Sequence, residues 1–206
     1  MHALSAPMAA DVDASGRAGS RASRLRTLGS IALIVSGILL GVVPLISNET
    51  TGGFWVGLLG DLLGFALLLA GVILISAGTA LAGRIILIAG AAVALFGFTW
   101  FLHLGLVVQV PIWGWSAATA LAFFCAGAAY AVERQAGLSI ASLLLCGGSL
   151  WTGVIVFGSP IWAPPYTYLP TSVAAIIVGL ALWTLDASAH RAATEPQGVP
   201  SNLSSH

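Results

Sequence analysis

Asp61 is the residue whose type and position point most directly to chemistry. It is the one acidic residue in or near an apolar run that lies away from the arginine-bearing ends of those runs. A carboxylate in hydrocarbon costs several kcal/mol, so an acid there is by default a functional hypothesis, namely a site for a proton or a cation. His103 ends a later apolar run, and its ordinary pKa of about 6.5 would let it sense acidity on the same side. If the first three runs pack together, Asp61, His103 and Glu49 would form an acid-responsive cluster.

The spacing of Asp61 from Arg84 favours a plainer role. About 23 residues separate the two, or about 34 Å of helix at 1.5 Å per residue. A hydrocarbon core is about 30 Å thick, so Asp61 would lie at the outer headgroup boundary, where a carboxylate costs little. We therefore expect Asp61 and His103 to be interfacial. The alternative is a proton- or cation-binding carboxylate in an outward-facing vestibule.

Aromatic residues near the outer ends of the runs form a second candidate site. Amphipathic rings prefer headgroup depth, so we expect an interfacial anchor, and the alternative is an outer docking surface for a partner or a lipid. Four prolines keep the segment 159–170, SPIWAPPYTYLP, from being helical throughout. The residues of this predicted docking surface are Trp113, Trp115, Trp162, Tyr166 and Tyr168.

Motifs of enzymes and metal centres are not found in the sequence. There is no Ser–His–Asp set, phosphate-binding glycine loop or H-E-x-x-H motif, and the glycine-rich stretches fall inside apolar runs. Cys125 and Cys146 lie in consecutive runs without C-x-x-C spacing. We expect two small buried apolar residues, with a disulfide as the alternative. The sequence thus predicts no catalytic residue, no metal and no cofactor.

Composition places all these residues in a membrane protein. Of the 206 residues, 58% are hydrophobic and 7% are charged, whereas a soluble domain carries about 25% charged residues. The formal net charge of zero argues against a nucleic-acid partner. A spanning helix needs about 20 apolar residues. The predicted spans are 28–47, a stretch from 61–64 to 83 within the longer run 54–83, 85–104, 112–131, 137–157 and 171–185.

The arginines set the predicted orientation. All seven basic residues are arginines, and all fall on one side of the six-span arrangement. By the positive-inside rule, that side and both termini are cytoplasmic. The spans would form three hairpins of about 50 residues each. The flanking segments 1–27 and 189–206 lack large apolar runs, so they are predicted to be disordered cytoplasmic tails around a transmembrane domain, 28–188.

Small and hydroxyl-bearing residues within the runs are expected to serve packing. Gly37-x-x-x-Gly41 and Gly60-x-x-x-Gly64 have the spacing that lets helices approach closely in lipid, and we expect them to act within the bundle. Serine and threonine hydroxyls inside a span can bond to their own helix backbone, so they need no substrate pathway to explain them.

The sequence as a whole predicts an all-α, multi-pass integral membrane protein without enzymatic activity. Its role would be structural, stress-related or complex-associated, and its partners the lipid bilayer and either another membrane protein or a second copy of itself. The alternatives are a small carrier for an apolar solute or lipid, or a proton-linked transporter that uses Asp61. The lack of lysine beside abundant alanine and glycine is typical of a GC-rich bacterial genome, which points to a bacterial plasma membrane.

Overall fold

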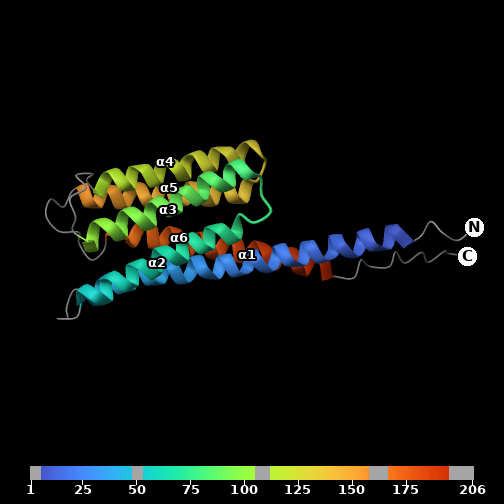
Figure 1. Ribbon diagram of the computed structural model, residues 1–206, viewed down its shortest axis with the longest axis horizontal. Coiled ribbons are helices and arrows are strands. Elements are labelled where there is room, and N and C mark those ends of the chain that lie inside the picture. Colours follow the sequence, from blue (N-terminus) through green and yellow to red (C-terminus); the bar gives the residue numbers. More distant parts are fainter. Residues whose placement is uncertain (1–5, 48–52, 105–111, 158–166, 195–206) are drawn as a thin grey trace, which may run out of the picture.

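The protein is a bundle of long helices (Figure 1). The computed structural model describes residues 6–47, 53–104, 112–157 and 167–194, with side chains described for 19–46, 55–97, 114–155 and 167–188. These ranges contain six helices and no strand, which confirms the all-α prediction. The helices are α1 (Ala6–Ser47), α2 (Gly53–Ile75), α3 (Leu81–Leu104), α4 (Ile112–Val132), α5 (Ala136–Phe157) and α6 (Leu169–Thr194).

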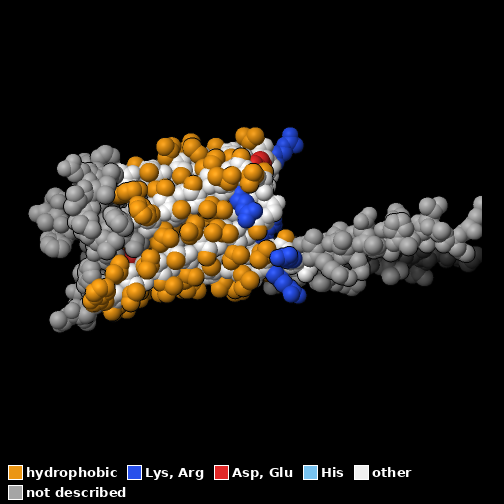
Figure 2. Space-filling view, viewed as in Figure 1, with side chains coloured by type: hydrophobic (Ala, Val, Ile, Leu, Met, Phe, Trp, Pro, Cys, Tyr) orange, Lys and Arg blue, Asp and Glu red, His pale blue; other side chains and the backbone are white. Residues whose placement is uncertain are grey.

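Five of these helices are long and apolar enough to cross a membrane: α1, α2, α4, α5 and α6. The described part of α3 adds a shorter apolar stretch, Leu81–Gly97. Large hydrophobic side chains cover the outside of the bundle between its two ends (Figure 2). In water such a surface would drive association, whereas lipid requires it. The structure therefore supports a membrane-embedded helical protein.

The helices form a closed ring. Each one packs against its neighbours in sequence, and α6 packs against α1 (Figure 1). The pairs of the predicted hairpins are therefore in contact, but so are α2 with α3 and α4 with α5, and no hairpin stands apart. The start of α1 and the end of α6 lie at the same end of the bundle (Figure 1).

Two short turns at that end hold neighbouring helices antiparallel. Between α2 and α3, Gly78 takes a positive φ of 82° in a turn that the Thr79 amide closes by donating to the Ser76 carbonyl at 3.2 Å. Between α4 and α5, Arg134 takes a φ of 58°, and the Gln135 amide donates to the Tyr130 carbonyl at 2.9 Å. The second turn is thus a Schellman ending with arginine where glycine is usual.

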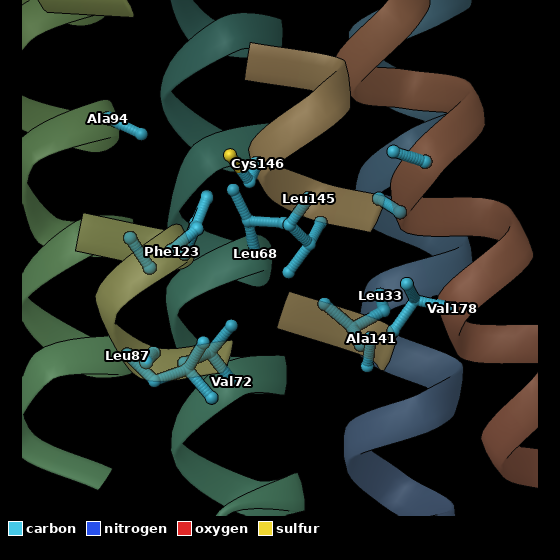
Figure 3. Packing of buried hydrophobic residues seen from close by; sticks show 14 of the residues in the cluster. Leu33, Leu68, Val72, Leu87, Ala94, Phe123, Ala141, Leu145, Cys146 and Val178 are labelled. Atoms are coloured by element: carbon cyan, nitrogen blue, oxygen red, sulfur yellow. The ribbon is translucent and has the colours of Figure 1, made fainter. Parts of the chain in front are cut away.

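The centre of the ring is filled by apolar side chains from all six helices. Leu68 of α2, Phe123 of α4 and Leu145 of α5 lie together there (Figure 3). Leu33 of α1 and Val178 of α6 lie beside one another in the same cluster (Figure 3). The middle of the bundle is therefore a packed core.

Glycines bring α1 against its two neighbours, as their spacing predicts. A Cβ atom added to Gly37 would lie 2.6 Å from the Ser172 carbonyl oxygen of α6. One added to Gly64 would lie 2.8 Å from the Leu40 side chain of α1. Backbone and side chains occupy the space that a larger residue would need. The prediction that these glycine motifs serve packing within the bundle is confirmed.

One predicted span boundary is wrong, and two helices extend into the segments predicted as tails. The second span ends at Ile75, not at residue 83, because the segment 76–80 forms the turn into α3. The segment 1–27 is helical from Ala6, since alanine and arginine favour helix and Pro7 falls in the first turn, where proline is tolerated. Helix α6 runs past 188 to Thr194 through an alanine-rich stretch. The remainder of the predicted carboxyl-terminal tail, 195–206, lies outside the described residues.

Candidate functional site

Asp61 is in the bundle interior, with 4% of its surface exposed. It belongs to the stripe of α2 that continues through Phe65, Leu68 and Val72, all fully buried, at the three- and four-residue spacing of one helix face. Asp61 is enclosed in the bundle, and its expected depth at the membrane interface stays a prediction. That prediction rested on a span counted back from Arg84, whereas α2 ends at Ile75, so Asp61 lies farther inside the apolar segment Trp55–Ile75.

Tyr168 lies beside Asp61, directly before α6. Its ring packs edge-on against Phe65, with centroids 5.3 Å apart and planes at 88°. Burial, together with the nearby Asp61 carboxylate, raises the pKa of the Tyr168 phenol well above its usual value. The phenol therefore stays protonated at physiological pH. The Asp61 carboxylate and the neutral Tyr168 phenol are therefore buried near one another.

Hydroxyl groups near this pair join helices to one another. The Ser36 hydroxyl of α1 donates to the Gly64 carbonyl of α2 at 2.8 Å, and the Ser172 hydroxyl of α6 donates to the Gly37 carbonyl of α1 at 2.6 Å. Thr152 of α5 and Thr171 of α6 share a hydrogen bond of 2.9 Å. The expectation that such hydroxyls bond to their own helix holds for Ser142 and Thr184 but not for Ser36 or Thr152. The Thr79 hydroxyl bonds within the turn that follows α2.

Two more buried hydroxyls lie on α4 at the same end of the bundle. Ser116 and Thr119 are almost fully buried, and neither hydroxyl has a hydrogen-bond partner among the described residues. Ser116 packs against Gly153 of α5, where an added Cβ atom would lie 2.9 Å from the serine Cβ. The end of the bundle that holds Asp61 is thus polar inside and apolar outside.

The predicted partners of Asp61 and most of the predicted docking surface lie outside the described side chains. His103 falls within α3 and Trp113 within α4, but neither side chain is described. Glu49, Trp162 and Tyr166 lie outside the described residues altogether. The pairing of Asp61 with His103 stays a prediction.

The two described members of that docking surface are not free. Tyr168 is buried, as above. Trp115 is half-buried against α3, where its ring atoms lie 2.5 Å from a Cβ atom added to Gly97. The Trp115 ring also contacts Phe96, with centroids 6.2 Å apart. Tyr168 is too deeply buried to belong to an outer surface, whereas the docking role of the half-exposed Trp115 stays a prediction.

The two cysteines are free and far from equivalent. Cys125 is exposed on the outside of α4, while Cys146 is buried in the central cluster (Figure 3). The disulfide alternative is therefore excluded, and the expected burial holds for Cys146 only. Within the described part of the chain, no three His, Cys, Asp or Glu side chains are grouped closely enough to hold a metal ion.

A second polar site, which the sequence did not single out, lies at the opposite end. Asp186 of α6 is half-buried, and its Oδ2 accepts hydrogen bonds from Ser23 at 3.2 Å and Thr27 at 3.1 Å, both on α1. Ser23 and Asp186 are 163 positions apart. An acid at the end of a span looks ordinary in sequence, and only the contact of α1 with α6 gives it partners.

Two pockets open on either side of Asp186. One, of about 400 Å³, is lined by Arg26, Thr79, Gln135 and the start of α5. The other, of about 560 Å³, lies between α1 and α6 and includes Arg24 and Trp183. Asp186 lines both. The described arginine side chains gather at this end, which we call the arginine end (Figure 2).

No protein-family model, curated protein or solved structure matches the chain.

Proposed function

We propose that the chain is a non-enzymatic, multi-pass protein of a bacterial plasma membrane that serves as a structural or complex-associated component. The observation that carries the proposal is the use of interior polar groups as links between helices. Four such links join α1 to α2, α1 to α6, α4 to α5 and α5 to α6. A hydrogen bond between helices in lipid contributes about 0.6 kcal/mol on average, so together they make a firm scaffold.

The same proposal includes six spans with both termini in the cytoplasm. Helix α3 has 24 residues, which is about 36 Å at 1.5 Å per residue and long enough to cross. The gathering of arginines at one end (Figure 2) supports a cytoplasmic location for that end. A reporter fused after His206 should be active in the cytoplasm, and one inserted at Gly52 should be active outside. An external reporter after His206 would contradict this orientation.

Native mass spectrometry of the chain released from nanodiscs of its host membrane tests the structural role. We expect a stoichiometric protein partner, or a second copy of the chain, in the released complex. The variant Trp55→Ala probes the outer surface of α2, since the Trp55 side chain is exposed there, and loss of the partner from this variant would place the contact on that surface. A lone chain that retains a small solute would contradict the structural role and favour a carrier.

The second candidate is a proton-linked carrier, and the burial of Asp61 beside Tyr168 favours it. A carboxylate in a membrane bundle is costly, so it is usually retained for function. Asp61→Asn keeps the size of the side chain and removes its ability to bind and release a proton. If the carrier hypothesis holds, this variant should abolish acid-driven uptake into vesicles at unchanged expression, whereas Glu133→Gln at the arginine end should not. Equal acid-driven uptake by Asp61→Asn and wild type would contradict the carrier hypothesis.

A further inference from the structure

The arginine end carries a carboxylate that two neutral groups hold in place. Ser23 and Thr27 both donate to Oδ2 of Asp186, so Oδ1 carries neither of these bonds. Neither hydroxyl brings a positive charge, so neither neutralises the carboxylate. A fixed carboxylate at the edge of a pocket is suited to a ligand ammonium group, because a hydrogen bond between ionised partners is stronger than one between neutral groups.

A positive side chain lines the same pocket. Arg26 and Asp186 both border the cavity of about 400 Å³, and Thr79 and Gln135 line it as well. A guanidinium is suited to phosphate, since its planar N–H donors match two phosphate oxygens. The first residues of α5 also line the cavity, and the leading N–H groups of a helix add donors for an anion.

The second pocket adds an apolar border and another arginine. It lies between α1 and α6 and is lined by Arg24 as well as Asp186. Leu28 and Trp183 line it too, with 56% and 47% of their surfaces exposed. Asp186 therefore borders both a cavity with charged groups and an apolar surface at the end of the helices. Tryptophan favours this depth, where the head groups of lipids lie.

We propose that Asp186 and Arg26 bind the head group of an aminophospholipid, with the ammonium at Asp186 and the phosphate at Arg26. The cavity is large enough for a head group but not for acyl chains, which would lie along the apolar side chains of α1 and α6. A purely anionic head group would bring a second negative charge next to Asp186 and supply no ammonium for it. The proposal rests on the membrane location proposed above and adds the class of lipid.

Lipid retention by the full chain tests the proposal. The chain is placed in nanodiscs with equal parts of phosphatidylethanolamine, phosphatidylglycerol and phosphatidylcholine, and native mass spectrometry counts the lipids that stay bound. We expect wild type to retain phosphatidylethanolamine about tenfold over the other two, as for one charge-assisted hydrogen bond. Phosphatidylcholine lacks N–H donors and phosphatidylglycerol lacks the amine.

Substitutions assign the preference to its groups. Asp186→Asn keeps an acceptor for Ser23 and Thr27 but removes the charge, so it should abolish the preference for phosphatidylethanolamine over phosphatidylglycerol. Arg26→Gln should lower retention of all three lipids about fivefold. Arg21→Gln is the matched control, because Arg21 is an exposed arginine on the same helix that lines neither pocket, and it should behave as wild type.

Three results would overturn the proposal. These are equal retention of the three lipids by wild type, an unchanged preference in Asp186→Asn, or retention of free phosphoethanolamine with no preference among the lipids, which would make the ligand water-soluble. In each case a chain that resists extraction by alkaline carbonate leaves the membrane proposal intact. A chain that carbonate extracts would overturn both.

Discussion

Asp61 and Asp186 lie at opposite ends of the bundle and show two ways in which a membrane protein keeps a carboxylate. Asp61 is enclosed among α2 residues and Tyr168, with 4% of its surface exposed. Asp186 is half-buried, is held by two hydroxyls of α1, and borders two pockets. Neither pocket includes Asp61. Asp61, which is conspicuous in an apolar stretch of sequence, is therefore enclosed. Asp186, which lies at the end of a span and is not conspicuous in sequence, borders open pockets.

The difference follows from what lies around each residue. The end that holds Asp61 is joined by hydrogen bonds between helices and by close glycine contacts. At the arginine end, two turns and the start of α5 surround space that side chains do not fill. A bound ligand has more room at Asp186, whereas a proton is small enough to reach an enclosed group such as Asp61.

The largest expected effect comes from placing a positive charge at each aspartate. Asp61→Arg should destabilise the folded protein by about 3 kcal/mol or more, because a buried charge would have no compensation. Asp186→Arg should cost less than about 1 kcal/mol, since the new side chain can extend into the pockets. Thermal unfolding in detergent, followed by tryptophan fluorescence, measures both. An equal loss of stability in the two variants would contradict the inference that Asp61 is more deeply enclosed than Asp186.

A smaller effect is expected at alkaline pH. The folded-state pKa of Tyr168 is raised, so its contribution to stability is fully present below about pH 10 and is lost as the pH rises through the raised value. Wild type should therefore lose stability above about pH 10. Tyr168→Phe keeps the ring contact with Phe65 and should reduce that loss.

Trp183→Phe serves as the control for this pH dependence. It changes an aromatic residue at the arginine end without adding or removing a titrating group, so its alkaline profile should match wild type. Midpoints of thermal unfolding between pH 7 and pH 11 give the comparison. If Tyr168→Phe follows the wild-type profile, the phenol does not contribute to the pH dependence.

The smallest expected effect compares one hydroxyl from each end. Ser172→Ala leaves the Gly37 carbonyl without its donor in the interior and should cost about 1 kcal/mol. Thr27→Ala should cost less than about 0.5 kcal/mol, because Asp186 keeps Ser23 and water can enter the adjoining pocket. Ser188→Ala, whose exposed hydroxyl bonds within α6, is the control and should be neutral. A reversed order would mean that the arginine end is the more tightly held of the two.

Much of the fold was predictable because hydropathy acts locally. Runs of apolar residues long enough to cross a membrane predicted the helices, and each described helix overlaps its predicted span. The boundary between α2 and α3 was missed because Ala77, Gly78 and Thr79 interrupt the run without adding charge. That one error placed Asp61 at the lipid boundary and led to its interfacial interpretation.

The candidate sites were predictable only in part. Asp61 stood out as a single acid among apolar residues, but its neighbour Tyr168 was assigned to an outer surface. In a membrane bundle both the lipid-facing and the interior sides of a helix are apolar, so periodicity does not mark the buried face. Asp186 was not singled out because its partners Ser23 and Thr27 are on the first helix and it is on the last.

The amino-acid sequence by itself therefore determined the helical membrane class, the approximate position of each helix and the end at which the arginines gather, since hydropathy and charge depend on neighbouring residues. Only the tertiary structure decided that Asp61 is enclosed with Tyr168 and that Asp186 borders two pockets. Both depend on which helix faces meet across more than a hundred residues, and packing of small residues and hydroxyls makes that choice.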